Sequence, residues 1–235
     1  MSKKRLLLLH NGTKRETASW VSRQFAEAGL EVDSYWAYNN EFPETLEAYD
    51  GVYISGSPHA AYEDVPFIQR EHALISDAAE QDLPMLGVCF GSQIMASALC
   101  GREQVFRRES CEVGYKWIDF TEAGKQDPLT AHLDPSVYMF IWHNDEVRDD
   151  HPDMTILASS DACPNQIWRY KERPFWGIQG HPEVTKANAE FWFDNDGAAF
   201  EQDGADLAEL RAAANDTLEA KTLLRRFAEV CKESE

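Results

Sequence analysis

The sequence predicts an α/β fold with a doubly wound, mostly parallel central sheet, helices on both faces, a smaller antiparallel β portion and C-terminal helices. Two observations lead to this prediction. In the first half of the chain, short apolar runs alternate with segments of helical spacing, as expected for strands and the helices that cover them. In the second half, short β-like runs follow one another, and the chain becomes helical after Pro182.

The first half begins with a continuously apolar run at residues 5–10, which suits a parallel strand covered on both faces. Further strands are expected at 30–38, 49–58 and 83–88, and helices at 15–28, 66–81 and 92–99. Gly29 and Gly101 end two of these helices, and Pro66 opens another. This alternation is the basis for predicting a doubly wound sheet.

The second half contains β-like runs at residues 110–120, 136–147, 154–160, 165–170 and 174–184. We expect a tight connection between antiparallel strands at 170–175 and a loop between helices at 194–206. We predict a single domain over residues 1–235, with about 196–235 as a helical C-terminal extension. The charged C-terminal helices are expected to cover an edge of the sheet or, alternatively, to form a dimer surface. The oligomeric state is not predicted.

Charge limits the partners that the chain can bind. Its 22 lysines and arginines are outnumbered by 41 aspartates and glutamates, which gives a formal net charge of −19. This excess disfavours nucleic acid and anionic membranes as partners. The apolar run after the basic start covers only residues 6–9, and the chain lacks the roughly 20 consecutive apolar residues of a membrane span. We therefore expect a cytoplasmic protein.

The cysteines are odd in number and include no C-x-x-C spacing, which argues against a disulfide framework or a structural zinc site. They stand at positions 89, 100, 111, 163 and 231. One of them is a candidate reactive thiol, and the others are expected to be small core or surface residues. Neither a metal nor a cofactor is predicted.

Cys89 stands between Gly87 and Gly91, where an apolar run meets a helix. In such a turn the nucleophile has a strained backbone, and bulkier neighbours than glycine would collide with the strand and the helix. The N–H groups and the dipole at the start of the helix favour a thiolate, and the backbone N–H of Phe90 is placed to receive an oxyanion. A buried cysteine beside two packing glycines is the alternative interpretation.

Seven histidines could supply the base that a thiol nucleophile needs. His181 is preferred because it follows an apolar strand, and sites collect at strand ends in α/β folds. Pro182 favours an extended conformation before it, so His181 and Glu183 should project to the same side. The carboxylate would then hold one ring nitrogen while the other faces the thiol. The alternative is an ordinary surface pair.

The sequence G-V-C-F-G-S-Q at residues 87–93, followed later by H-P-E at 181–183, resembles the class I glutamine amidotransferase family. The resemblance spans about residues 5–195 and implies the flavodoxin-like fold of that family. It also implies a catalytic triad made of Cys89, His181 and Glu183. Within the family, the chain resembles stand-alone proteins similar to the glutaminase domain of GMP synthase.

The resemblance implies further site residues. The stretch at 53–64 is similar to the family's glycine-containing loop, so Gly56 is expected to join the Phe90 N–H in an oxyanion hole. Contacts to the head group of the substrate are implied for Gln93, His143 and Asp145. The reaction would be hydrolysis of the γ-amide of glutamine through a γ-glutamyl thioester. Ammonia would pass to a separate acceptor, so a separate synthase subunit is an expected partner.

Two positions leave the substrate open. Gly180 precedes H-P-E, and its small size is expected to leave room for a larger leaving group, as in the γ-glutamyl peptide hydrolases of the same superfamily. Asn144 is expected either to narrow the head-group pocket or to add a hydrogen bond. Two other interpretations are a catalytically silent binding or regulatory protein on this fold and an α/β-hydrolase with a cysteine nucleophile. The short stretch at 107–110 is expected to be a solvated turn that could also meet a phosphate or carboxylate.

Overall fold

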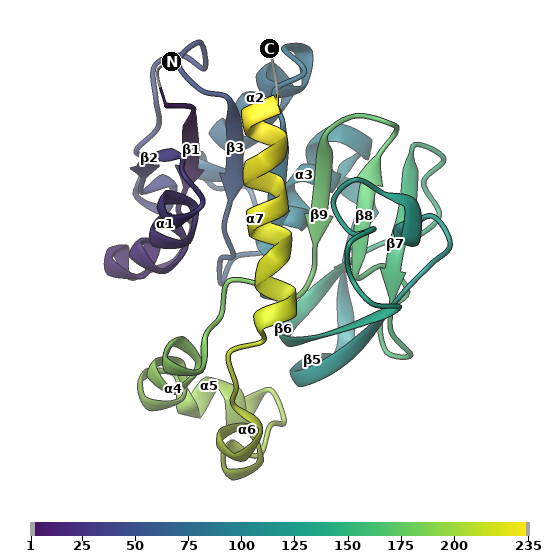
Figure 1. Cartoon of the computed structure of the whole chain (residues 1–235). Helices are drawn as coiled ribbons and strands as arrows, with labels where there is room; N and C mark the ends of the chain where they lie inside the picture. The colour runs from purple at the N-terminus through teal and green to yellow at the C-terminus, as the bar shows by residue number, and fades with distance from the viewer. Residues whose placement is uncertain (1–2, 234–235) are drawn as a thin grey trace.

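The computed structural model describes residues 3–233, and within them nine strands form one mixed, curled sheet (Figure 1). Along the sheet the strand order is β2–β1–β3–β4–β9–β8–β7–β5–β6. The strands are β1 (Arg5–Leu9), β2 (Glu31–Tyr35), β3 (Gly51–Ile54), β4 (Met85–Val88), β5 (Val105–Phe120), β6 (Ser136–Val147), β7 (Met154–Ser159), β8 (Ile167–Tyr170) and β9 (Phe175–Ile178).

The sheet consists of two halves that differ in strand direction. Strands β2, β1, β3, β4 and β9 are parallel, whereas the pairs from β9 through β8, β7 and β5 to β6 are antiparallel. The predicted α/β class is therefore confirmed, and the antiparallel portion continues the same sheet. The tight connection expected at 170–175 joins β8 to β9, the pair at which strand direction changes.

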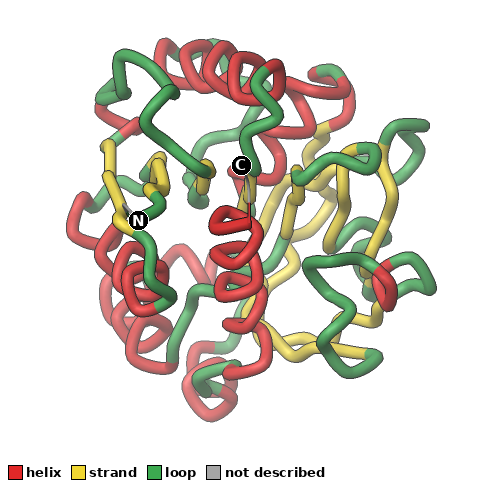
Figure 2. The backbone as a smooth tube through the Cα atoms, turned by 45° about the horizontal axis from the view of Figure 1, so that its top comes forward, coloured by secondary structure: helices red, strands yellow, loops and turns green. Residues whose placement is uncertain are grey.

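Helices cover both faces of the parallel half (Figures 1 and 2). On one face lie α1 (Ala18–Glu27) and α7 (Leu218–Glu233), packed against Leu6 and Leu8 of β1. On the other lie α2 (Pro66–Glu80) and α3 (Phe90–Cys100), packed against the alternate leucines of the same strand. Successive side chains of a strand point to opposite faces, so the continuous apolar run of β1 supplies both cores.

The C-terminal helices differ from the prediction in one respect. Helix α7 covers a face of the sheet beside α1 rather than an edge, because its apolar stripe with Leu223, Leu224 and Phe227 packs into the core of that face. In Figure 1 it runs along the middle of the viewer's side of the sheet. The single domain over residues 1–235 stays a prediction.

The loop predicted at 194–206 was wrong in its central part. Helix α4 (Lys186–Asn195) is followed directly by the short helix α5 (Gly197–Gln202), and α6 is Leu207–Ala213. Phe200 is fully buried and anchors α5 against aromatic side chains of β6 and α4. Tertiary packing thus stabilises a helix too short to form on its own.

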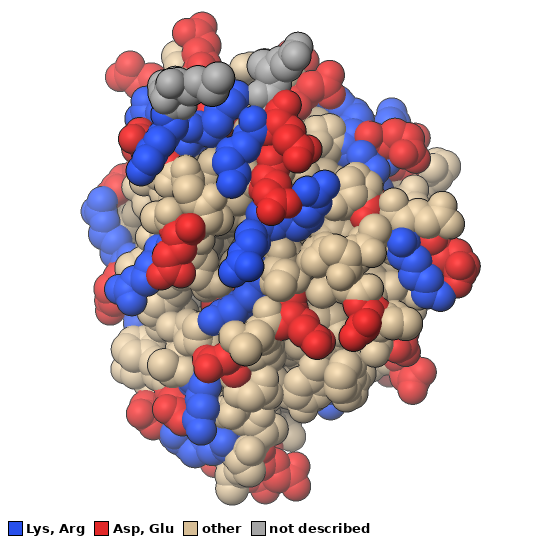
Figure 3. All heavy atoms as spheres, in the orientation of Figure 1, with Lys and Arg blue, Asp and Glu red and all other residues tan. Residues whose placement is uncertain are grey.

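The distribution of surface charge and the character of the helices relate to two partners considered above, nucleic acid and membranes. On the side of the molecule shown in Figure 3, lysines and arginines lie interspersed with aspartates and glutamates, so the acidic excess is not gathered into one patch there. Within residues 3–233, no helix is both long and apolar enough to cross a membrane.

Candidate active site

The turn that holds Cys89 has the predicted strand-to-helix geometry. Cys89 follows β4 and directly precedes α3, with backbone angles φ 55° and ψ −112°. Its N–H donates to the carbonyl of Ile178 on β9 at 2.8 Å, which ties the turn to the neighbouring strand. Positive φ is costly for a residue with a side chain, and such strain is held in place only by the surrounding structure.

The two glycines beside Cys89 are required by close backbone contacts. A Cβ atom at Gly87 would overlap the backbone of Gly91, and a Cβ at Gly91 would overlap the carbonyl of Ile54 on β3. Helix α3 can therefore begin directly above the sheet only when both positions lack side chains. The predicted steric reason for these glycines is confirmed.

His181 and Glu183 lie beside the thiol of Cys89. His181 Nδ1 is 2.8 Å from Glu183 Oε1, and the imidazole also forms a hydrogen bond with the Cys89 side chain. All three residues are buried, and the backbone N–H of His181 donates to the carbonyl of Phe140 at 2.8 Å. The imidazole is thus held between a carboxylate and a thiol, which is the arrangement predicted from the sequence.

Neighbouring charges control the protonation of His181. Burial alone would lower its pKa, but the negative charges of Glu183 and of the Cys89 side chain outweigh burial and raise the pKa to about 10. A carboxylate and a sulfur on opposite sides of one ring both favour the imidazolium. The ring is therefore well suited to accept a proton from the thiol.

Two backbone N–H groups were predicted to bind an oxyanion. Phe90 is the first residue of α3, so its N–H has no partner inside the helix. Gly56, just after β3, lies beside Cys89 and His181. A Cβ atom at Gly56 would lie 3.3 Å from His181 Cε1 and 3.5 Å from Cys89 Cβ. A side chain at position 56 would therefore crowd the space beside the thiol.

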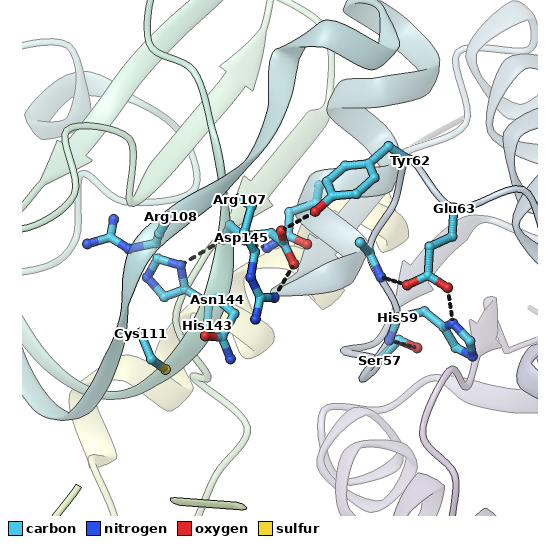
Figure 4. Close-up of polar contacts among 12 residues, drawn as sticks. Ser57, His59, Tyr62, Glu63, Arg107, Arg108, Cys111, His143, Asn144 and Asp145 are labelled. Carbon is cyan, nitrogen blue, oxygen red and sulfur yellow. Dashed lines mark hydrogen bonds and ion pairs between the residues drawn. The ribbon is translucent and has the colours of Figure 1, made fainter. Parts of the chain in front are cut away.

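The predicted head-group contacts lie in a hydrogen-bonded group around Asp145 on β6. Gln93 Nε2 donates to the carbonyl of Asp145 at 2.9 Å, and the hydroxyl of Tyr62 donates to its carboxylate at 2.8 Å (Figure 4). Arg107 forms an ion pair with the same carboxylate at 3.4 Å. Tyr62 was missed in the sequence, because a single tyrosine in a loop carries no recognisable signal.

The stretch at 107–110 is part of β5 rather than a free turn. It contains the register shift between Arg107 and Glu112, and Arg108 pairs with Glu146. The two arginines are therefore bound to carboxylates of β6, the strand opposite. The irregular pairing of the two strands explains why the sequence alone suggested a turn.

His143 lies in a buried polar network with Asp145 and Glu112. Its Nδ1–H donates to the carbonyl of Asp145 at 2.8 Å, and its Nε2 lies 2.9 Å from Glu112 Oε2. Both ring nitrogens face oxygen atoms. Burial alone would raise the pKa of Glu112, but the hydrogen bond with His143 lowers it. A substrate contact by His143 stays a prediction.

A second group of cysteine, histidine and glutamate surrounds this network. The side-chain ligand atoms of Glu112, His143 and Cys163 all lie within 4.8 Å of one another, so the three could hold a metal ion. Burial raises the pKa of the fully buried Cys163 to about 12. Because Nε2 of His143 is committed to Glu112, we assign this group to the hydrogen-bonded core of the molecule.

The space beside Gly180 is filled rather than open. A Cβ at this position would come within 2.5 Å of both Met139 Sδ and Ile141 Cδ1. The expectation that Gly180 leaves room for a large leaving group was therefore wrong. The two side chains on β6 occupy the volume that a larger residue would take.

Asn144 adds a hydrogen bond, one of the two expected outcomes. Its amide donates to the carboxylate of Asp203, at the end of α5, at 3.2 Å. The side chain is thus directed toward the C-terminal helices.

A strained cysteine at the carboxyl end of a parallel strand, with an imidazole against its sulfur, is the arrangement of an enzyme that uses a thiol nucleophile. The profile of the family described as glutamine amidotransferase class-I matches residues 14–196, most of the chain. The chain belongs to the class I glutamine amidotransferases. It is accordingly an enzyme of the glutamine amidotransferase type with a cysteine nucleophile.

Individual relatives agree with this family. A GMP synthase [glutamine-hydrolyzing] from Enterobacter sp. (strain 638) is 30% identical over 189 residues, which cover 78% of this chain and 34% of that protein. A similar match to GMP synthase from Escherichia coli O1:K1 / APEC is 29% identical with the same coverage. The chain thus spans about a third of the length of these curated relatives.

Solved structures share the fold. A glutamine amidotransferase from Thermotoga maritima superposes with a TM-score of 0.84 at 24% identity, covering 100% of both chains. A protein from Thermoplasma acidophilum, described as a putative GMP synthase subunit, superposes with a TM-score of 0.70 at 19% identity, covering 99% of this chain and 96% of that one.

Proposed function

We propose that this enzyme hydrolyses the γ-amide of glutamine, with Cys89 as the nucleophile, His181 as the base and Glu183 as the group that orients the base. The observation that carries the proposal is the position of the His181 ring, between the Glu183 carboxylate at 2.8 Å and the Cys89 thiol. The strained turn around Cys89 supports it, because such strain recurs where a nucleophile must be presented.

The steps follow from this geometry. The thiol proton of Cys89 passes to His181, and the sulfur attacks the δ-carbon of the substrate to form a tetrahedral oxyanion. His181 then protonates the leaving nitrogen, ammonia departs, and a γ-glutamyl thioester remains on the sulfur. Water, deprotonated by the same imidazole, attacks the thioester; glutamate leaves and Cys89 regains its proton. Glu183 holds the ring tautomer and stabilises the imidazolium throughout.

The substrate oxyanion would be bound by the N–H groups of Phe90 and Gly56. The first lies at the start of α3, where the helix dipole also favours negative charge, and the second belongs to a residue that adjoins the Cys89 side chain and the His181 ring. The α-amino and α-carboxylate end of the substrate would then lie near Asp145, whose carbonyl is held by hydrogen bonds from Gln93 and His143. These assignments form one continuous path from the sulfur to β6.

Released ammonia would be used by a separate chain or acceptor. The curated relatives are named GMP synthase, and this chain matches about a third of their length. One structural neighbour is described as a putative subunit of GMP synthase, which supports a glutaminase that works beside a separate synthase protein. Hydrolysis of γ-glutamyl peptides remains the alternative activity, and Gly180 gives it no support.

The test is glutamate release from a panel of L-glutamine, γ-glutamyl dipeptides and simple γ-glutamyl amides. We expect turnover of glutamine that is lost in Cys89→Ala and kept in Cys163→Ala, the matched control from the second cysteine, histidine and glutamate group. A preference for γ-glutamyl peptides would replace the proposal with a peptide hydrolase. Loss of activity only in Cys163→Ala would overturn the assignment of the nucleophile.

A further inference from the structure

Asp203, at the end of α5, binds two side chains of β6 at once. Its carboxylate accepts a hydrogen bond from the indole N–H of Trp142 at 2.7 Å and from the amide of Asn144 at 3.2 Å. Trp142 and Asn144 are two residues apart on a strand, so their side chains share a face, and one carboxylate can hold both. Asp203 is half-buried, which strengthens these charge-assisted bonds.

Aromatic packing continues this attachment to the catalytic base. The ring of Trp142 stacks on Phe200 of α5 at a centroid distance of 3.9 Å and also contacts Trp192 of α4. Trp192 in turn meets the imidazole of His181 edge-on, at 5.4 Å. Helix α5 therefore contacts the site through Trp142 of β6, and helix α4 contacts it through both Trp142 and His181.

The segment that Asp203 holds borders the nucleophile. The carbonyl of Trp142 lies 3.7 Å from Cys89 Sγ, within reach of the thiol proton. Asn144 and Asp145 follow on the same strand, and Figure 4 shows them across from the loop that carries Ser57 and Tyr62. The conformation of residues 142–145 therefore determines the shape of the site on one side of the thiol.

We propose that Asp203 is a positioning residue of the active site: it fixes the Trp142–Asn144 segment against the thiol and so makes α4 and α5 a required part of the substrate pocket. This inference rests on the proposed function for its kinetic readout. Asp203 contacts neither the nucleophile nor the base, so its effect on the reaction passes through β6.

The experiment compares Asp203→Ala and Asp203→Asn with Asp206→Ala in the full chain. Asp206 is a matched control, because it is an aspartate in the same helical extension whose carboxylate only caps α6. We expect Asp203→Ala to raise KM for glutamine at least tenfold while kcat changes less than threefold. Asp203→Asn should give a smaller rise, since its amide oxygen can still accept from Trp142. Asp206→Ala should leave KM within twofold of the wild type.

A double-mutant cycle sharpens the result. Asn144→Ala combined with Asp203→Ala should raise KM no more than Asp203→Ala alone, because Asn144 acts through its hydrogen bonds to Asp203. Wild-type KM in Asp203→Ala would overturn the proposal. Equal increases of KM in Asp203→Ala and Asp206→Ala would also overturn it, since they would indicate general loosening of the extension.

A second readout does not depend on glutamine turnover. Iodoacetamide labelling of Cys89, followed by peptide mass spectrometry to separate it from Cys111, reports how tightly the segment closes over the thiol. We expect labelling to be at least fivefold faster in Asp203→Ala than in the wild type or Asp206→Ala. If the wild type releases no glutamate, the proposed function fails, and equal labelling rates would then separately overturn the role of Asp203.

Discussion

The molecule contains two groups of one cysteine, one histidine and one glutamate, and they differ in almost everything except composition. In the first, Cys89 stands on a strained turn and meets an imidazole that is backed by Glu183. In the second, Cys163 lies in the loop between β7 and β8, and both nitrogens of His143 are bound to oxygen acceptors. Only the first has a ring nitrogen directed at a sulfur by hydrogen bonding.

The difference shows that the backbone, rather than the residue types, decides which group can carry out chemistry. A thiol needs a base with a free nitrogen and a place for the oxyanion. The turn at Cys89 presents the thiol to His181 and lies directly at the start of α3. Cys163 has neither, and burial raises its pKa to about 12. The second group instead ties β5 to β6 through the Glu112–His143 pair.

The largest expected contrast is in thiol reactivity. At pH 7.5 we expect iodoacetamide to label Cys89 at least a thousandfold faster than Cys163 in the native protein. The reason is that Cys163 is fully buried with a pKa of about 12, whereas Cys89 has a base beside it. Mass spectrometry of the labelled peptides over time measures both rates. Comparable labelling rates for Cys89 and Cys163 would contradict the prediction that only the Cys89 group contains a reactive thiol.

Substitution of the two glutamates should separate activity from stability. We expect Glu183→Gln to lower kcat by about a hundredfold or more, because the imidazole loses its orienting carboxylate. Glu112→Gln should instead lower the free energy of unfolding by about 3 kcal/mol, since it removes the carboxylate from a fully buried hydrogen-bonded pair with His143. Glutamate release and urea unfolding measure the two effects. A swap of the two phenotypes would reverse the assignment of the groups.

Stability should depend on pH through His181. Its pKa is raised to about 10 from 6.5, so the folded state binds this proton more tightly than the unfolded chain does. The resulting stabilisation is fully present below about pH 6.5 and is lost as pH rises through about 10.

Urea unfolding of the wild type and His181→Gln at pH 6, 8 and 10 tests this dependence. The stability difference between them should shrink by about 2 to 4 kcal/mol from pH 6 to pH 10, from the linkage of roughly 1.4 kcal/mol per pKa unit. A constant difference across this range would mean that His181 holds no extra proton in the folded state.

The smallest expected effect concerns the wall of the site. We expect Gly180→Ala to lower the free energy of unfolding by about 1 to 3 kcal/mol, because the added methyl group would press on Met139 and Ile141. Its ratio of kcat/KM for glutamine over a γ-glutamyl dipeptide should stay within threefold of the wild type. Thermal unfolding and the same substrate panel check both expectations; a large change in preference would restore Gly180 as a determinant of the leaving group.

Much of the fold could be predicted because its signals are local. The continuous apolar run of β1, the helix opened by Pro66 and the short connection after β8 each have a recognisable pattern of a few residues. Helix α5 could not be predicted, because it spans only six residues and its single buried residue, Phe200, gives no periodicity. The roles of Tyr62 and Arg107 could not be predicted either, because their common partner, Asp145, is distant in the sequence.

The sequence by itself indicated the strand-to-helix turn at Cys89, since an apolar run meets a segment of helical spacing there and glycines flank the cysteine. It also indicated the His181–Glu183 pair from their spacing of two residues. The expected extended segment was wrong, because Pro182 and Glu183 lie in a turn that the Val184 N–H closes by donating to the carbonyl of His181. Only the tertiary structure decided that His143 faces Glu112, that Met139 and Ile141 fill the space at Gly180, and that Asp203 reaches β6. These contacts join residues far apart in the chain, and their geometry arises from how the curled sheet brings β6 to the helices after residue 185.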